Sequence, residues 1–161
     1  HPESAYFARG TGHDPYTNYS EDPEVWAANM DRLARKFETV RSAMPKPVIQ
    51  HRDGATVGII SVGSTDPAII EACDYLETEG LPIDYLRLRA LPINSEVIEF
   101  INKYDRVYVI EMNRDGQLHQ ILSIETPETC TKLISLTHND GLQITAKWVK
   151  ESIQAEERNN G

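Results

Sequence analysis

The sequence predicts an α/β fold: a three-layer, Rossmann-like sandwich in which helices cover both faces of a mostly parallel, five-stranded sheet. Two observations support this prediction. Short apolar segments rich in β-branched residues, such as 57–62 and 107–110, alternate with longer segments whose apolar residues recur at helical spacing. The segment 107–110 is also apolar on both faces, which is typical of a strand buried inside a parallel sheet. Strands that alternate with helices form such sheets through right-handed crossovers.

Two prolines, Pro45 and Pro47, mark the expected boundary between an N-terminal arm and the α/β domain. Neither proline continues a helix, and both favour extended backbone. We therefore assign residues 1–45 to the arm, a loop plus a long helix, and residues 46–161 to the α/β domain.

The arm begins with a loop over residues 1–21 that is rich in aromatic and histidine side chains, a composition that does not favour disorder. Asp22 and Pro23 then provide an N-cap and a first helical residue. The apolar residues of this helix follow at spacings of four, three, four and three, which predicts one packing stripe for another domain or another chain. The stripe consists of Trp26, Met30, Leu33, Phe37 and Val40.

The α/β domain is expected to begin with a hairpin. A strand at 48–49 would run antiparallel at the edge of the sheet, turn at Asp53–Gly54 and return as the central strand 56–62. Strands and helices then alternate, and residues 156–161 are expected to form a polar, frayed tail. The expected elements are a helix to residue 79, a strand at 83–88, a helix from Asn94 or Ser95, a strand at 107–112, a helix at 116–123, a strand at 132–136 and a helix capped by Thr145.

The composition restricts the class of protein and its partners. A net charge of −9 and a pI of about 5.0 argue against nucleic acid and anionic membranes, because both require a basic face. Cys73 and Cys130 form no C-x-x-C pair, so no cluster or zinc site is predicted. Because no apolar run spans a membrane and no signal peptide is visible, we expect a cytoplasmic location. The chain starts at His1 without methionine, so we expect it to be part of a longer protein.

Polar residues follow the buried strand 107–110 directly. The carboxyl ends of strands are where open α/β sheets meet ligands and partners. Glu111, Asn113 and Gln117 are therefore predicted to form an interface or a strand-end site.

The densest polar segment of the arm runs from Arg9 to Asp14. Arginine binds a carboxylate through two parallel hydrogen bonds, and glycines let backbone N–H groups approach a ligand closely. Arg9, Thr11 and His13 are thus candidates for binding a carboxylate substrate. The alternative is that Arg9 pairs with an acidic side chain and the loop packs on a neighbour; the residues by themselves leave both interpretations open.

Several catalytic patterns are missing from the sequence. It contains no G-x-G-x-x-G, no P-loop lysine, no G-x-S-x-G and no ordered catalytic triad. The Gly-Asp-Gly pattern that accompanies thiamine diphosphate and Mg²⁺ is also absent. A small dehydrogenase or hydrolase is therefore disfavoured, and we predict no catalytic residue, no bound cofactor and no metal in this chain.

The motif E-x-N-x-x-G-Q-L at 111–118, after a buried strand, resembles the second domain of the alpha subunit of 2-oxoacid:ferredoxin oxidoreductases. That domain is similar to the C-terminal domain of transketolase. Further segments resemble the same family in the same order, and the segment RGTGHD is most similar to the 2-oxoglutarate and general 2-oxoacid types rather than to the single-chain pyruvate type. These segments are YFARGTGHDPY at 6–16, RKFETV at 35–40, VGIISVGST at 57–65 and THNDGLQIT at 137–145.

The resemblance implies a holoenzyme that decarboxylates a 2-oxoacid oxidatively, forms an acyl-CoA and reduces ferredoxin. Thiamine diphosphate, Mg²⁺ and iron–sulfur clusters would be held by other domains or by the beta and gamma subunits. This chain would be the C-terminal part of the alpha subunit, inactive on its own, with other domains, those subunits or a second copy as partners. Arg9 would bind the 2-oxoacid carboxylate, and Thr11 and His13 would support the loop. The alternative is a free-standing Rossmann-like module for small-molecule binding or protein interaction.

Overall fold

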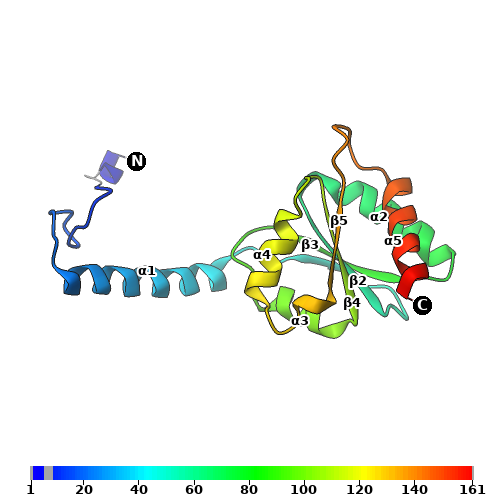
Figure 1. The fold of residues 1–161 in the computed structure, drawn as a ribbon, viewed down its shortest axis with the longest axis horizontal. Coiled ribbons are helices and arrows are strands. Elements are labelled where there is room, and N and C mark those ends of the chain that lie inside the picture. The colour runs from blue at the N-terminus through cyan, green and yellow to red at the C-terminus, as the bar shows by residue number, and fades with distance from the viewer. Residues whose placement is uncertain (1, 6–8, 161) are drawn as a thin grey trace. The chain divides into compact units, whose positions relative to one another are not determined.

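The computed structural model describes residues 2–5 and 9–160 and divides the chain into two compact units, residues 1–43 and 44–161 (Figure 1). The first unit contains a short 3₁₀ turn, η1 (Pro2–Ser4), a loop and the helix α1 (Pro23–Ala43). The second unit contains the sheet and the remaining helices.

Helix α1 begins where the sequence predicts, because the Asp22 carboxylate accepts a hydrogen bond from the Glu24 N–H at 2.8 Å. No residue of α1 is buried among the residues that the structure describes. The side chains of Trp26 and Phe37 are 54% and 52% exposed. The helix that carries the apolar stripe is therefore formed as predicted.

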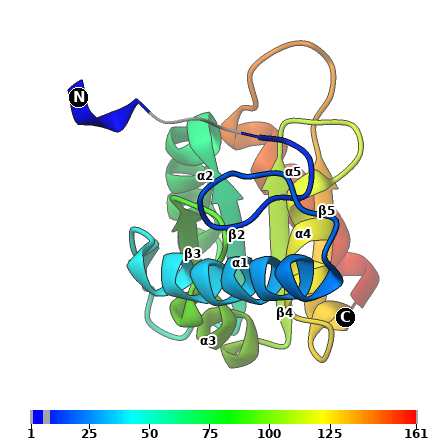
Figure 2. The same cartoon turned by 90° about the vertical axis from the view of Figure 1, so that its left-hand side faces the viewer.

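The second unit is built on a sheet with the strand order β1-β3-β2-β4-β5, and Figure 2 shows the four parallel strands side by side. β1 pairs with β3 in the antiparallel direction, and the other neighbours are parallel. The predicted fold class, including the single antiparallel edge strand, is confirmed. The strands are β1 (Val48–Gln50), β2 (Val57–Val62), β3 (Ile83–Leu88), β4 (Arg106–Glu111) and β5 (Leu133–Thr137).

Two helical layers cover the sheet (Figure 1). Helices α2 (Asp66–Thr78) and α5 (Ala146–Asn160) pack on one face, and α3 (Ser95–Lys103) and α4 (Gln117–Glu125) pack on the other. Neighbouring residues of β2 point into different cores: Ile59 joins the core under α2 and α5, and Ile60 joins the core under α3 and α4. This two-sided burial explains why the central strands are apolar throughout.

The predicted hairpin is wrong. A turn does form at 52–55, where the Ala55 N–H donates to the Arg52 carbonyl at 3.2 Å. The strand before it, however, pairs with β3 rather than with β2. Both edges of β2 are occupied by parallel partners, β3 and β4, so the only place left for β1 on that side is the outer edge of β3.

The predicted frayed tail is also wrong, because α5 continues to Asn160. Glu157 accepts hydrogen bonds from Arg106 Nη2 at 2.7 Å and from the Tyr108 hydroxyl at 2.6 Å. These bonds fasten the last turns of α5 to β4. Gly161 lies outside the described residues. None of the helices in the described part of the chain is long and apolar enough to cross a bilayer.

Candidate functional site

A pocket of about 510 Å³ opens at the carboxyl ends of β2, β3 and β4. The chain passes from β2 to β3 on one side and then returns to β4 on the other side, so the strand order reverses next to β2. Ligands of open α/β sheets bind at such reversal points. The lining includes Val62, Ser64, Arg89, Leu91, Glu111, Met112, Asn113, Gln117 and Ile121.

Glu111 lies at the end of β4, where it is 3% exposed. Its carboxylate accepts hydrogen bonds from the N–H groups of Leu118, at 2.8 Å, and His119, at 3.0 Å. It also accepts one from the side-chain amide of Asn113. The negative charge thus rests on the N-terminus of α4, where the helix dipole favours it. Both carboxylate oxygens are engaged in holding this helix.

Asn113 completes the same cap. Its side-chain oxygen accepts hydrogen bonds from the N–H groups of Gly116, at 2.8 Å, and Asp115, at 3.1 Å. Gln117 follows as the first residue of α4, is exposed and also lines the pocket. The structure therefore brings all three predicted strand-end residues to one pocket, with Glu111 and Asn113 shaping its wall.

The rest of the lining combines the polar residues Ser64 and Arg89 with apolar side chains that are open to solvent. Val62 is 42%, Leu91 46%, Met112 38% and Ile121 37% exposed. Both carboxylate oxygens of Glu111 accept hydrogen bonds from the protein, and the open apolar side chains beside them are suited to contact with an apolar surface.

The loop with the other predicted residues lies in the first unit and folds back on itself. The Ser20 N–H donates to the Gly12 carbonyl at 3.0 Å, and His13 and Tyr19 form an antiparallel bridge. A Cβ at Gly12 would lie 2.6 Å from the Ser20 carbonyl oxygen, so only glycine fits there. The Asp14 carboxylate closes the turn by accepting bonds from the Tyr16 and Asn18 N–H groups.

Arg9 and His13 each contact another residue of this loop. The Arg9 guanidinium carbon is 5.7 Å from the centre of the Tyr19 ring, a cation–π distance. His13 Nδ1 lies 2.8 Å from the Thr11 carbonyl oxygen, which orients the imidazole. Arg9 and Thr11 are exposed and His13 is partly exposed, so the three predicted residues share one accessible loop.

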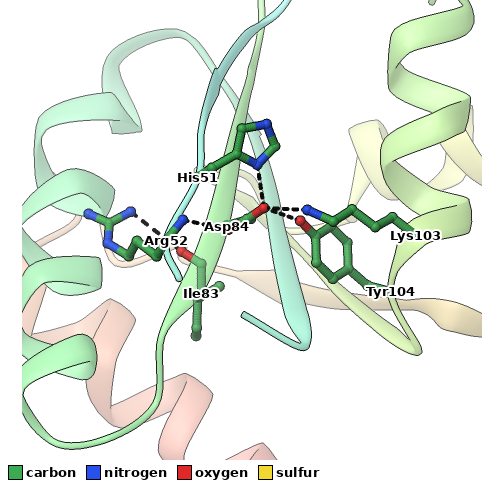
Figure 3. Close-up of polar contacts among 6 residues, drawn as sticks. All are labelled: His51, Arg52, Ile83, Asp84, Lys103 and Tyr104. Atoms are coloured by element: carbon green, nitrogen blue, oxygen red, sulfur yellow. Dashed lines mark hydrogen bonds and ion pairs between the residues drawn. The ribbon is translucent and has the colours of Figure 1, made fainter. Parts of the chain in front are cut away.

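A second polar cluster was missed by the sequence analysis (Figure 3). Asp84 of β3 is 1% exposed and accepts hydrogen bonds from His51, Arg52, Lys103 and Tyr104. A carboxylate inside the apolar strand 83–88 is the signal that could have revealed it, because a buried charge requires partners.

The described residues contain no group of three or more His, Cys, Asp or Glu side chains arranged for a metal ion.

Comparison with solved structures defines the class of fold. A 2-oxoglutarate:ferredoxin oxidoreductase from Magnetococcus marinus, solved with 2-oxoglutarate, coenzyme A and succinyl-CoA bound, superposes with a TM-score of 0.78 and 24% identity over 96% of this chain and 27% of that chain. A split-gene transketolase, an inactive beta4 tetramer, gives a TM-score of 0.56 and 22% identity over 67% of this chain and 40% of its own. The second unit thus has a transketolase-like α/β fold.

Comparison of sequences identifies a relative of this chain. The chain is 31% identical over 122 residues, 73% of its length, to subunit alpha of 2-oxoacid:ferredoxin oxidoreductase 2 from Aeropyrum pernix. The chain is therefore homologous to a region of a 2-oxoacid:ferredoxin oxidoreductase alpha subunit. It spans about a fifth of that relative, 19% of its length. No family model matches the sequence.

Proposed function

We propose that this chain is the C-terminal, non-cofactor-binding region of the alpha subunit of a thiamine-diphosphate-dependent 2-oxoacid:ferredoxin oxidoreductase of the 2-oxoglutarate type. The observation that supports this proposal is the 31% identity to an alpha subunit over 73% of the chain. In the proposed enzyme a 2-oxoacid is decarboxylated oxidatively to an acyl-CoA, and ferredoxin accepts the electrons. Other parts of the assembly hold the cofactor and the clusters, and this chain contributes substrate capture and subunit contacts.

The experiment that tests the activity uses the complete alpha chain together with its beta, and where present gamma, subunit. We expect reduction of a viologen dye that depends on both a 2-oxoacid and coenzyme A. Omission of either substrate is the control. An assembled, cofactor-loaded complex without such reduction would contradict the proposal.

Within the proposed enzyme, the loop of Arg9 binds the 2-oxoacid carboxylate. A net charge of −9 repels a dicarboxylate such as 2-oxoglutarate, so capture requires a local cation. Arg9 provides a planar donor pair on an exposed loop, and the bond between His13 Nδ1 and the Thr11 carbonyl helps to shape that loop.

We expect Arg9→Ala in the full complex to lower kcat/KM for the 2-oxoacid by roughly ten- to a thousandfold, the range for losing a charge-assisted hydrogen bond. Arg9→Lys should restore only part of the loss, because lysine cannot donate two parallel bonds. Arg32→Ala on the exposed face of α1 is the matched control and should leave the kinetics unchanged. If Arg9→Ala left the kinetics unchanged, Arg9 would not bind the 2-oxoacid.

The pocket at the strand ends and the stripe of α1 are proposed as contact surfaces with other domains or subunits of the enzyme. Ile121→Glu in the pocket should weaken assembly of the complex at least about tenfold, because it places a charge in an apolar contact. Ile124→Glu is the control, since Ile124 is 79% exposed and does not line the pocket. Native mass spectrometry measures the assembly of the complex. A contact at the pocket would be contradicted if Ile121→Glu left assembly unchanged, or if both substitutions weakened it equally.

A further inference from the structure

The Asp84 carboxylate joins three elements of the second unit (Figure 3). One oxygen accepts a hydrogen bond from the Arg52 backbone N–H at 2.8 Å. The other accepts bonds from His51 Nδ1 at 2.5 Å, from Lys103 Nζ at 2.9 Å and from the Tyr104 hydroxyl. The donors come from the loop after β1 and from the end of α3, so the bonds bridge both to β3.

The cluster keeps Asp84 ionised. Burial alone would raise its pKa, but hydrogen bonds from Tyr104, Lys103, the Arg52 N–H and His51 outweigh burial and lower the pKa to about 2. A buried, ionised carboxylate is tolerated only while its partners remain in place. Any movement that withdraws the loop at 51–52 therefore leaves part of this charge unpaired.

Few other contacts hold β1, apart from those of Ile49, which packs against the core under α3 and α4. It is three residues long and forms three residue pairs with β3. None of its residues is buried, and Val48 is 44% exposed. Short edge strands with little apolar burial detach readily from their sheets.

The same loop has a second anchor on α2. Arg52 Nη2 lies 2.7 Å from Asp74, and Arg52 Nε lies 3.3 Å from Glu77. Both carboxylates are largely open to solvent, with side chains 65% and 48% exposed, so these ion pairs contribute less than the bonds to Asp84.

We propose that the hydrogen bonds to Asp84 hold β1, and with it the chain segment that leads in from the first unit, at the edge of the sheet. While these bonds are in place, β1 and the loop at 51–52 stay at the edge of the sheet; just before β1, Lys46 Nζ lies 2.7 Å from a carboxylate oxygen of Glu96. When the bonds to Asp84 are broken, we expect β1 and the loop at 51–52 to separate from β3 more often. This inference does not depend on the proposed enzymatic function.

The test is hydrogen–deuterium exchange of the 161-residue chain, read by mass spectrometry. Asp84→Asn replaces one carboxylate oxygen with an NH₂ group, which cannot accept hydrogen bonds from the surrounding donors. His51→Ala removes one of these donors, and the His51 side chain is largely exposed. We expect exchange over residues 48–52 to accelerate at least tenfold in Asp84→Asn and about three- to tenfold in His51→Ala. Exchange over β4 should stay within about twofold.

Asp74→Asn is the matched control, because it removes one of the two ion pairs by which Arg52 holds the same loop on α2, and it should accelerate exchange of β1 less than His51→Ala does. Unchanged exchange of β1 in a folded Asp84→Asn chain would overturn the proposal. Equal acceleration in all strands would overturn it too, because Asp84 would then stabilise the sheet as a whole. If Asp84→Asn does not fold, His51→Ala decides between the same outcomes.

Discussion

Three residues at the junction of β4 and α4 determine the path of the chain there. Glu111 and Asn113 satisfy the N–H groups that open α4. Gly116, with φ of +64°, makes the turn into the helix. Polar residues and glycine at the end of a buried strand therefore have a structural role here as well as a place beside the pocket.

Gly116→Ala should lower the free energy of unfolding by about 2 kcal/mol, because an L-residue is strained at this φ and the new Cβ would lie 2.8 Å from Ser135 Oγ. Gly141→Ala separates the two causes. It has φ of +84° but nothing within 4 Å of its Cβ position, so only strain of about 1 kcal/mol is expected. Urea unfolding of both variants measures the difference, and equal losses would show that crowding at Gly116 is negligible.

Asp84 should make stability depend on acid pH. Its folded pKa of about 2 lies below the ordinary value of 3.8, so its contribution is complete above pH 4 and is lost as the pH falls to about 2. Protonation of Asp84 over this range is expected to lower the free energy of unfolding by about 2 kcal/mol. The urea midpoints of the unaltered chain and of Asp84→Asn, measured at pH 5, 4, 3 and 2, should therefore approach each other as the pH falls. A constant gap across this range would contradict the pKa assignment.

At the scale of elements, the last turns of α5 depend on one carboxylate. Glu157 receives two bonds from Arg106 and one from Tyr108, and burial together with the Glu157 hydrogen bond raises the pKa of the Tyr108 hydroxyl. A polar segment that would fray by itself is thus held against β4.

Glu157→Gln should lower the free energy of unfolding by about 1–2 kcal/mol, because it replaces a bidentate charged pair. Glu151→Gln on the same helix is the control. Its partner Lys147 lies 3.8 Å away with both side chains exposed, so a change below about 0.5 kcal/mol is expected. Chemical unfolding followed by circular dichroism measures both, and equal effects would mean that Glu157 does not hold the helix.

At the scale of the whole molecule, the sheet separates two apolar cores. The two cysteines differ in their exposure to solvent. Cys73 lies on the buried face of α2, and burial raises the pKa of its thiol to about 11. Cys130 is partly exposed, and its thiol donates to the Pro127 carbonyl at 3.2 Å. Only the partly exposed thiol is accessible to a reagent in the folded state.

A thiol reagent at pH 8 should therefore modify Cys130 in the native chain at least roughly a hundredfold faster than Cys73. In Cys130→Ser, labelling should appear only across the urea transition, which makes Cys73 a reporter of global unfolding. Rapid labelling of Cys73 without denaturant would mean that the core under α2 opens locally.

The local periodicity of the sequence was enough to predict the fold class, the apolar stripe of α1 and most element positions. Helical spacing, capping residues such as Asp22, and apolar runs act over a few residues, so the sequence displays them directly. The resemblance carried by the segments at 6–16 and 107–118 also pointed to the alpha subunits to which the chain proved homologous.

The tertiary structure decided what depends on residues that are far apart in the chain. β1 pairs with β3 because both edges of β2 are already occupied, and Glu157 meets Arg106 from 51 positions away. Asp84 gathers donors from 32 or 33 positions before it and 19 or 20 after it. Such contacts leave no period in the sequence, because the energy of a buried charge or a strand edge depends on which neighbours the whole fold places beside it.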